Sequence, residues 1–334
     1  MTTLLEFREK MKIFLGKYDI YIFSALKFIL ALTAFLMING NVGFMSRLKN
    51  PGIALILALL CSFLPVNLIA VFGSVLILAH AYALSMEVFA VSFVVIAVMF
   101  LLFFRTAPQY GYLLILTPIA FVCRVPYLVP LAMGLIGTPV TAVPVGCGTV
   151  VYYLLHYMKL NTALLGDTES QTMKQKLTYL VDNVVKNKEM ILMVVAFALT
   201  ILVVYAVRRM SVDHSWSIAI GVGAVTDLIM ILVGGMLLHV SVKLLPVLLG
   251  SVISAVIVLV LQMTLFNLDY SRTEYVQFED DEYYYYVKAV PKVTIAVPEK
   301  KVKKISVQKK SAAGRKKSSA AKKQAPHQNH SHKE

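Results

Sequence analysis

One carboxyl group stands in the middle of a long apolar segment. Asp227 follows Thr226 within HSWSIAIGVGAVTDLIMILVGGMLLHV, residues 214–240. Ionisable side chains are costly inside a membrane, and those found there usually serve a substrate, an ion or a proton. We therefore treat Asp227 and Thr226 as candidate pathway residues that bind a proton or a cation. The alternative is a polar residue at the water-exposed tip of a helical hairpin, since the glycines of this segment favour a break.

A second candidate is GTPVTAVPVGCG, residues 137–148, which holds three glycines and two prolines. Proline removes a backbone N–H and glycine loosens the backbone, so both interrupt helices. At membrane depth the released backbone groups persist only beside protein or a water-filled cavity, where freed carbonyls can coordinate a cation. The alternative is a packing feature or a turn between two short helices. The candidate residues are Gly137, Thr138, Pro139, Thr141, Pro144, Gly146 and Gly148.

Two further polar residues complete the set of candidate pathway residues. Asn67 lies close to Pro65, where residues 51–84 are expected to break into two helical pieces. Arg124 lies between short apolar pieces of the central region, where it would face an anionic substrate or a lipid headgroup. A loop at the membrane surface is the alternative for Arg124.

The motifs of several enzyme classes do not occur in the sequence. No P-loop, HExxH, CxxC or GxSxG pattern is present, and these motifs hold phosphates, metals, redox thiols or a nucleophilic serine. The three cysteines, Cys61, Cys123 and Cys147, lack disulfide-framework spacing and are expected to pack as small residues. We therefore expect no enzyme, no cofactor and no metal site. Energy for transport would come from an ion gradient or from a separate ATPase.

The composition of the chain is that of a membrane protein. It has 334 residues, of which 58% are hydrophobic, and a mean hydropathy of +0.74. Apolar runs close to the roughly 20 residues that span a bilayer cover 20–38, 88–104, 190–207 and 244–266. They lack the two-residue alternation of membrane β-barrels. These runs predict an all-α polytopic membrane protein.

Two helical units of similar layout flank a central Gly/Pro-rich element. The first transmembrane unit is 19–106, the central short-helix membrane region is 107–158, and the second transmembrane unit is 190–268. In each unit a span leads to a broken or re-entrant stretch and then to another span. VNLIAVFGSVLILAH at 66–80 resembles VTDLIMILVGGMLLH at 225–239. An internal repeat, as in many transporters, and a chance match between apolar sequences are both open.

Lysine and arginine residues near the spans indicate the orientation. Residues 1–18 are expected to form an amphipathic interfacial helix, and 159–189 a cytoplasmic loop with an amphipathic helix of its own. Both termini and this loop are therefore placed on the cytoplasmic side of a bacterial-type plasma (inner) membrane. Three simple spans after the loop would put the tail outside, so the sequence favours a hairpin, or two short crossing helices, at 214–240.

The chain changes character twice after the last span. Residues 269–298 are expected to form a cytoplasmic, acidic and Tyr-rich β segment, in which Tyr275–Phe278 and Tyr283–Val290 make a hairpin and 293–297 adds a third strand. Residues 299–334 are lysine-rich and are expected to be disordered. This tail would contact anionic headgroups of membrane lipids, and nucleic acid is disfavoured as a partner. The residues expected to make these contacts are Lys300, Lys301, Lys303, Lys304, Lys309, Lys310, Arg315, Lys316 and Lys317.

These features favour a transporter-like integral membrane protein, such as a permease subunit that moves a small solute or an ion. A separate ATPase or another cytoplasmic protein would be its partner, and a homo-oligomer is compatible with the sequence. The alternative is a non-transporting membrane scaffold whose cytoplasmic tail recruits partners. A flux measurement separates the two.

Overall fold

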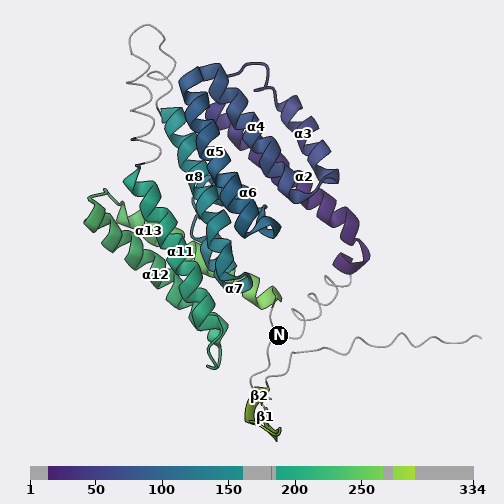
Figure 1. Ribbon diagram of the computed structural model, residues 1–334, viewed down its shortest axis with the longest axis vertical. Coiled ribbons are helices and arrows are strands. Elements are labelled where there is room, and N and C mark those ends of the chain that lie inside the picture. Colours follow the sequence, from purple (N-terminus) through teal and green to yellow (C-terminus); the bar gives the residue numbers. More distant parts are fainter. Residues whose placement is uncertain (1–13, 161–181, 183–185, 266–273, 290–334) are drawn as a thin grey trace, which may run out of the picture. The chain divides into compact units, whose positions relative to one another are not determined.

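The computed structural model describes residues 14–160, 182, 186–265 and 274–289 (Figure 1). The amphipathic helices expected in 1–18 and 159–189 lie largely outside these residues. The third strand and the lysine-rich tail lie wholly outside them. The described part of the chain is helical apart from one β-hairpin.

Seven helices in the described part of the chain are long and apolar enough to cross a membrane. Large apolar side chains face outwards on them, for example Phe93, Leu101 and Leu237. Exposed apolar surface on this scale is typical of helices that face lipid. The expected class, a multi-pass helical membrane protein, is confirmed at this level. The seven are α2 (Asp19–Val42), α4 (Val66–Leu84), α5 (Met86–Thr106), α8 (Ala142–Leu160), α11 (Lys188–Arg208), α12 (Ser215–Leu238) and α13 (Leu244–Leu265).

Shorter elements lie between the long helices. α3 (Pro51–Phe63) has 13 residues, α6 (Leu113–Val122) has 10 and α7 (Leu128–Ile136) has nine. Single 3-10 turns, η1 (Pro108–Tyr110) and η2 (Pro139–Thr141), precede α6 and α8. Proline opens both turns, because its fixed φ suits a first helical position where no N–H is needed.

Capping side chains and prolines set several helix boundaries. Asn50 accepts a hydrogen bond from the Gly52 N–H (2.9 Å) at the start of α3. Asn187 accepts one from the Met190 N–H (2.9 Å) at the start of α11. Each bond satisfies an N–H that has no partner inside its helix. Pro65 separates α3 from α4, at the point where the sequence predicted an interruption.

The helices run between two ends of the bundle. At one end, which we call the Lys159 end, Lys159 Nζ donates to Asn41 Oδ1 (3.1 Å) and joins the last residues of α8 and α2. At the other, which we call the Arg208 end, α11 finishes at Arg208 beside the end of α7. α3 returns along α2, because Ser62 Oγ donates to the Ser24 carbonyl (2.9 Å) near the start of α2.

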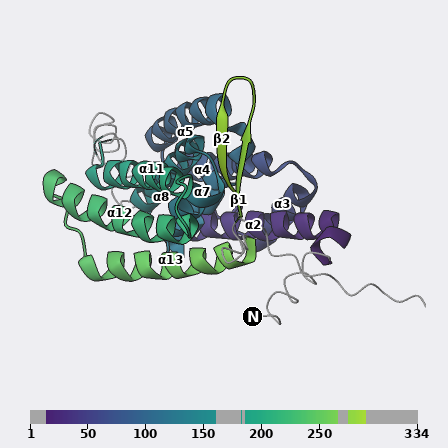
Figure 2. The same ribbon diagram turned by 90° about the horizontal axis from the view of Figure 1, so that it is seen from below.

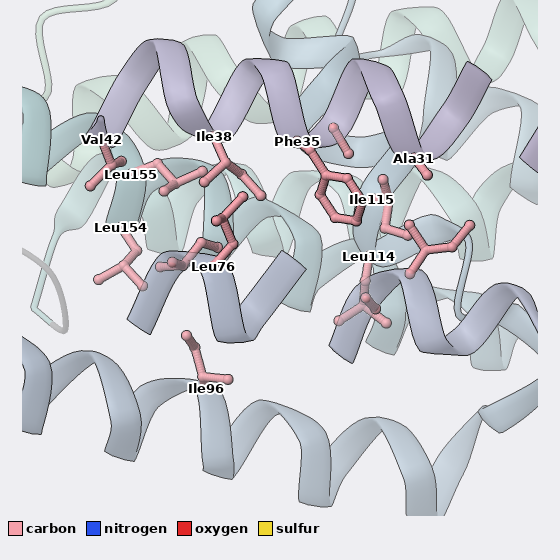
Figure 3. Close-up of a cluster of buried hydrophobic side chains, with 14 of the residues drawn as sticks. Ala31, Phe35, Ile38, Val42, Leu76, Ile96, Leu114, Ile115, Leu154 and Leu155 are labelled. Carbon is pink, nitrogen blue, oxygen red and sulfur yellow. The ribbon is translucent and has the colours of Figure 1, made fainter. Parts of the chain in front are cut away.

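Buried apolar clusters hold the helices together. In the first, side chains from α2, α4, α5, α6 and α8 converge, among them Phe35, Leu76, Ile96 and Leu154 (Figure 3). A second cluster joins α6, α7, α8, α11 and α12 around Phe197. Lipid tails are as apolar as these side chains, so close van der Waals packing, rather than exclusion of water, orders such a bundle.

α12 is one continuous helix of 24 residues, so the hairpin predicted at 214–240 is wrong. The segment contains no proline, and its glycines serve close packing rather than a turn. A Cβ on Gly223 would overlap Val204 of α11, and one on Gly234 would overlap Leu192 of the same helix. Small residues let membrane helices approach closely in this way. Figure 2 shows α11 and α12 side by side.

The continuity of α12 changes the expected orientation. α11, α12 and α13 alternate in direction, so α11 begins and α13 ends at opposite ends of the bundle. The parity that would put the 159–189 loop and the tail on one side depended on a break within 214–240. The expectation that both are cytoplasmic therefore loses this support and stays a prediction.

A β-hairpin follows the helices, as the sequence predicted. β1 (Glu274–Glu279) pairs antiparallel with β2 (Tyr284–Ala289). The Phe278 and Tyr285 rings stack across the strands with centroids 4.9 Å apart. Most side chains of both strands are exposed. Cross-strand aromatic pairs of this kind are the main side-chain stabilisation that a two-stranded sheet can have.

Asp280 closes the turn of this hairpin. Its Oδ1 accepts hydrogen bonds from the backbone N–H groups of Glu282 (3.0 Å) and Tyr283 (2.7 Å), and its Oδ2 accepts one from the Tyr285 hydroxyl (2.8 Å). These bonds favour the ionised form. They hold the pKa of the Asp280 carboxyl below its ordinary value, the Glu282 bond contributing most.

Replacing Asp280 with alanine should open the turn and melt the hairpin, because two-stranded sheets are marginal in water. A pKa below the unfolded value means that the carboxyl stabilises the turn at neutral pH. That contribution is lost as the pH falls from about 4 through the folded-state pKa. Amide NMR shifts of Glu282 and Tyr283 in the full-length protein would report both effects. Asp281→Ala is the control, and an equal loss there would contradict the assignment.

Candidate functional site

Asp227 lies near the middle of α12 and is fully buried. The Thr200 hydroxyl of α11 donates a hydrogen bond to its Oδ1 (2.7 Å). Its Oδ2 has no hydrogen-bond partner among the described residues. The alternative of a solvated hairpin tip is therefore wrong. Native proteins rarely bury a polar atom without a partner, and such atoms in membrane helices are candidates for function.

Tyr127 stands at the N-terminus of α7 and is also buried. Its ring makes an edge contact with Phe197 of α11, with centroids 6.2 Å apart. Phe197 lies midway along α11, so α7 begins inside the bundle rather than at either end. The sequence did not single out Tyr127, because nothing local distinguishes it from the other tyrosines of the central region.

Arg124 forms the joint between α6 and α7. It adopts a left-handed conformation with φ 60°. The Arg124 N–H donates to the Phe121 carbonyl (3.0 Å) and the Val125 N–H to the Ala120 carbonyl (2.9 Å), which is the Schellman pattern at the end of α6. Glycine is the usual residue at this position, and arginine there is strained. The Arg124 side chain is exposed, so it does not share the buried surroundings of Asp227.

A pocket of about 390 Å³ lies between α8, α11 and the link from α12 to α13. Its polar lining includes Tyr153, His156, Glu189 and Lys243. The last turns of α8 and the first turn of α11 contribute the first three of these groups, so the pocket belongs to the Lys159 end. Acidic, basic and phenolic groups together make it suitable for water and small ions.

The inner wall of this pocket includes Tyr127, Met193 and Ile231. Ile231 follows Asp227 by one helical turn, so the two side chains share one face of α12. The pocket therefore stops one turn short of the buried carboxyl. Sequence reasoning missed Glu189 as a pocket residue, because a carboxyl at the start of a span looks like an interfacial group.

Arg208 fills the turn between α7 and α8. Its guanidinium donates hydrogen bonds to the carbonyls of Leu135 and Gly137, the latter at 2.7 Å. Thr141 Oγ1 donates to the Thr138 carbonyl (2.7 Å). The carbonyls released at the end of α7 are thus bound by protein groups, as membrane depth requires. A transported cation, which the sequence suggested for this turn, would have to displace Arg208.

Pro144, Gly146 and Gly148 lie within α8. Pro144 falls in the first turn, where a backbone N–H has no acceptor inside the helix, so it causes no break. A Cβ on Gly148 would lie 2.7 Å from the Cβ of Thr117 in α6. Gly146 borders a separate apolar cavity of about 590 Å³ between α5, α8 and α11. These three residues shape helix packing, and they do not line the pocket beside Tyr127.

Thr226 and Asn67 each donate a hydrogen bond to a backbone carbonyl away from Asp227. Thr226 Oγ1 donates to the Val222 carbonyl one turn earlier in α12 (2.8 Å), although it precedes Asp227 in the sequence. Asn67 Nδ2 donates to the Pro108 carbonyl (2.7 Å) and ties the start of α4 to η1. The structure therefore brings neither side chain to the buried carboxyl, and the hydroxyl that binds Asp227 comes from α11 instead.

Comparison with protein-family models, with curated proteins and with solved structures finds no match to the chain. The fold and the site alone define its class. It is a multi-pass helical membrane protein that buries a carboxyl between two of its long helices.

Proposed function

We propose that the protein is a transporter-like membrane protein that moves a small solute or an ion, as a permease or a permease subunit. The observation that carries the proposal is the buried Asp227, which has one hydroxyl partner and one oxygen without a partner among the described residues. A purely structural helix gains nothing from such a group, because it is expensive in an apolar interior. Proton relays and ion pathways are the usual reason for keeping one.

The short helices of the central region support this proposal. α6 and α7 have 10 and nine residues, so each is about 15 Å long and cannot span a bilayer core of about 30 Å. Their joint contacts Phe197, midway along α11, through Phe121 and Tyr127. We propose that α6 and α7 form the re-entrant element, entering and leaving by the Arg208 end. Half-helices that meet near mid-depth line the binding sites of many transporters.

The proposed orientation follows from the directions of the helices. The chain returns along α2 through α3, as the bond from Ser62 to Ser24 shows, so the start of α2 and the end of α13 both lie at the Arg208 end. Residues 288–334 carry 14 of the 32 basic residues, so we place this end in the cytoplasm of a bacterial-type cell. The Lys159 end and the 159–189 loop then face the opposite side.

This orientation can be tested with a cysteine-free background in which Cys61, Cys123 and Cys147 are replaced. A cysteine introduced within 159–189 should react in intact cells with a thiol reagent that cannot cross membranes. One introduced within 299–334 should react only after permeabilisation. The reverse pattern would invert the orientation, and labelling of both in intact cells would disprove the alternation of the last three helices.

Flux through reconstituted protein tests the proposed function. Proteoliposomes should show uptake of small solutes, or dissipation of an imposed ion gradient, that Asp227→Asn reduces by tenfold or more, which corresponds to about 1.4 kcal/mol or more. Thr200→Val should reduce it less, because it removes one hydrogen bond but keeps the carboxyl. Thr226→Val is the matched control, since its hydroxyl bonds only to its own helix. Flux that survives Asp227→Asn would exclude this residue from transport.

The scaffold function is kept as a second candidate because of the β-hairpin. Its rings are largely exposed, with Tyr275 at 79% and Tyr286 at 78%. Exposed tyrosines are typical of protein-binding surfaces. Deleting 271–334 should then release a cytoplasmic partner, such as an ATPase subunit, without changing helix content. A deletion that leaves every co-purifying protein in place would reject the scaffold.

A further inference from the structure

The packing around Asp227 differs between its two sides along α12. Toward the Arg208 end, a Cβ on Gly223 would overlap Val204 and would lie 2.7 Å from Leu131 Cδ2. That side is closely packed. Toward the Lys159 end, the next turn of α12 brings Ile231 to the wall of the polar pocket. The carboxyl therefore has a cavity on one side and a packed helix interface on the other.

Ionisable groups line the cavity side. Glu189 and Tyr153 both line the pocket. Tyr127 stands in its wall together with Ile231, which follows Asp227 by one helical turn. A carboxyl in the pocket, a phenol in its wall and a carboxyl behind that wall thus lie in order from the Lys159 end inward.

The surroundings of Asp227 suit a proton rather than a metal cation. The Thr200 hydroxyl already donates to Oδ1, which leaves Oδ2 as the free acceptor among the described residues. Metal cations such as Ca²⁺ and Mg²⁺ need about six oxygen ligands. The described residues contain no group of three or more His, Cys, Asp or Glu side chains that could hold a metal ion. A proton needs only the one free lone pair.

We propose that the pocket is a one-sided vestibule through which Asp227 gains and loses a proton from the Lys159 end only. This rests on the proposed function and deepens it, because it names the coupling ion and the side from which it enters. On entry, a proton passes from a hydronium ion in the pocket to Oδ2 along water that reaches Asp227 when the Tyr127 side chain moves aside. An O–H bond forms at Oδ2, and a water molecule stays behind in the pocket. On release the same bond breaks and the proton returns to water.

Every element packed against α12 is consistent with this assignment. α11 presents the Thr200 hydroxyl to Asp227, and α7 places Tyr127 in the pocket wall that also includes Ile231. α13 contributes Ser251, whose hydroxyl bonds to the Ala224 carbonyl (3.4 Å), and carries no ionisable residue. No counter-charge from a neighbouring helix faces the carboxyl among these groups. Tyr127 is a positioning residue in this scheme, since it separates the vestibule from Asp227.

The test uses full-length protein reconstituted in liposomes. The orientation of the protein is determined from whether added protease removes a C-terminal tag. The probe is dicyclohexylcarbodiimide, which dissolves in lipid and adds to a protonated carboxyl. The O-acylisourea that forms rearranges to a stable N-acylurea, which peptide mass spectrometry detects at Asp227. Labelling should rise several-fold when the solution at the Lys159 end is acidified, and it should not change when only the Arg208 end is acidified.

Variants make the result specific to the vestibule. Asp227→Asn should remove the labelled peptide, whereas Glu87→Gln on α5 should leave labelling at Asp227 unchanged. Tyr127→Ala should allow a water-soluble carbodiimide added at the Lys159 end to label Asp227, which the wild type should resist. Glu189→Gln should slow the response to acid at that end without abolishing it. These four outcomes together support the vestibule.

Labelling that follows the pH of the Arg208 end, or of both ends equally, would overturn the proposal. So would a Tyr127→Ala protein whose Asp227 resists the water-soluble reagent. The proposed transport function fails separately. If labelling depends on the pH of the Lys159 end but no flux is found, the vestibule is supported and the transport function is rejected. If flux requires Asp227 but labelling follows the pH of the Arg208 end, transport is supported and the vestibule is rejected.

Discussion

Replacing Arg208 with alanine should destabilise the protein by roughly 3 kcal/mol or more, because two carbonyls at the end of α7 would lose a charged donor. The Arg208 guanidinium binds the carbonyls of Leu135 and Gly137. It also lies over the rings of Tyr205 and Trp216, at 4.9 and 5.7 Å from their centroids. Leu135 and Gly137 are buried, so water would replace these donors poorly and the α7–α8 turn should open.

Arg209 is a matched control for Arg208. It is the next residue, it is exposed, and its main contact is a hydrogen bond to the Tyr205 hydroxyl (2.9 Å). Exposed contacts of this kind contribute about 1 kcal/mol or less. Thermal unfolding in detergent should therefore show a large loss for Arg208→Ala and a small one for Arg209→Ala. Equal losses in the two variants would mean that Arg208 does not hold the turn.

The sequence predicted the apolar spans well because hydrophobicity over 20 residues depends only on local composition. Residues 88–104 and 190–207 fall within α5 and α11. Prolines also marked true interruptions, as Pro65 does between α3 and α4. The hairpin of β1 and β2 followed from tyrosines around an acidic turn. Each of these signals lies within a short stretch of chain.

Glycine was the misleading signal. The same residue that loosens a helix in water lets two helices touch in a membrane, and the sequence alone does not say which role applies. In α12, Gly223 and Gly234 pack against α11, and the helix is continuous. At residue 137 a glycine does end a helix, and Arg208 from 71 residues away binds its carbonyl. A partner so distant in the sequence leaves no local trace.

The sequence likewise revealed some residues of the candidate site and missed others. Asp227 was found from its own surroundings, because a carboxyl in an apolar run is conspicuous in one stretch of sequence. Its hydrogen-bond partner was not predicted, because Thr200 lies on another helix, 27 residues away in the sequence. The pocket draws on α6, α8, α11, α12, α13 and the links between them, so no pattern within one element reveals Tyr127 or Glu189 as its residues. Contacts between different helices could not be predicted from local patterns in the sequence.

Gly148→Ala should destabilise the protein, although alanine favours a helix more than glycine does. The added Cβ would lie 2.7 Å from Thr117 Cβ and 3.1 Å from the Leu113 carbonyl oxygen, and neither atom is the end of a flexible side chain. α6 would have to shift. Overpacking of this kind costs about 1–3 kcal/mol, which exceeds the gain of up to about 1 kcal/mol in helix propensity.

Two other glycines provide a graded comparison for Gly148. A Cβ on Gly146 would meet Val194 Cγ1 at 3.3 Å, and one on Gly221 would meet nothing within 4 Å. Melting temperatures should therefore fall most for Gly148→Ala, little for Gly146→Ala, and stay level or rise for Gly221→Ala. The same order in vesicle flux would mean that the glycines of α8 act through helix packing. If Gly146→Ala abolished flux without lowering the melting temperature, Gly146 would instead be a candidate residue of the transport pathway.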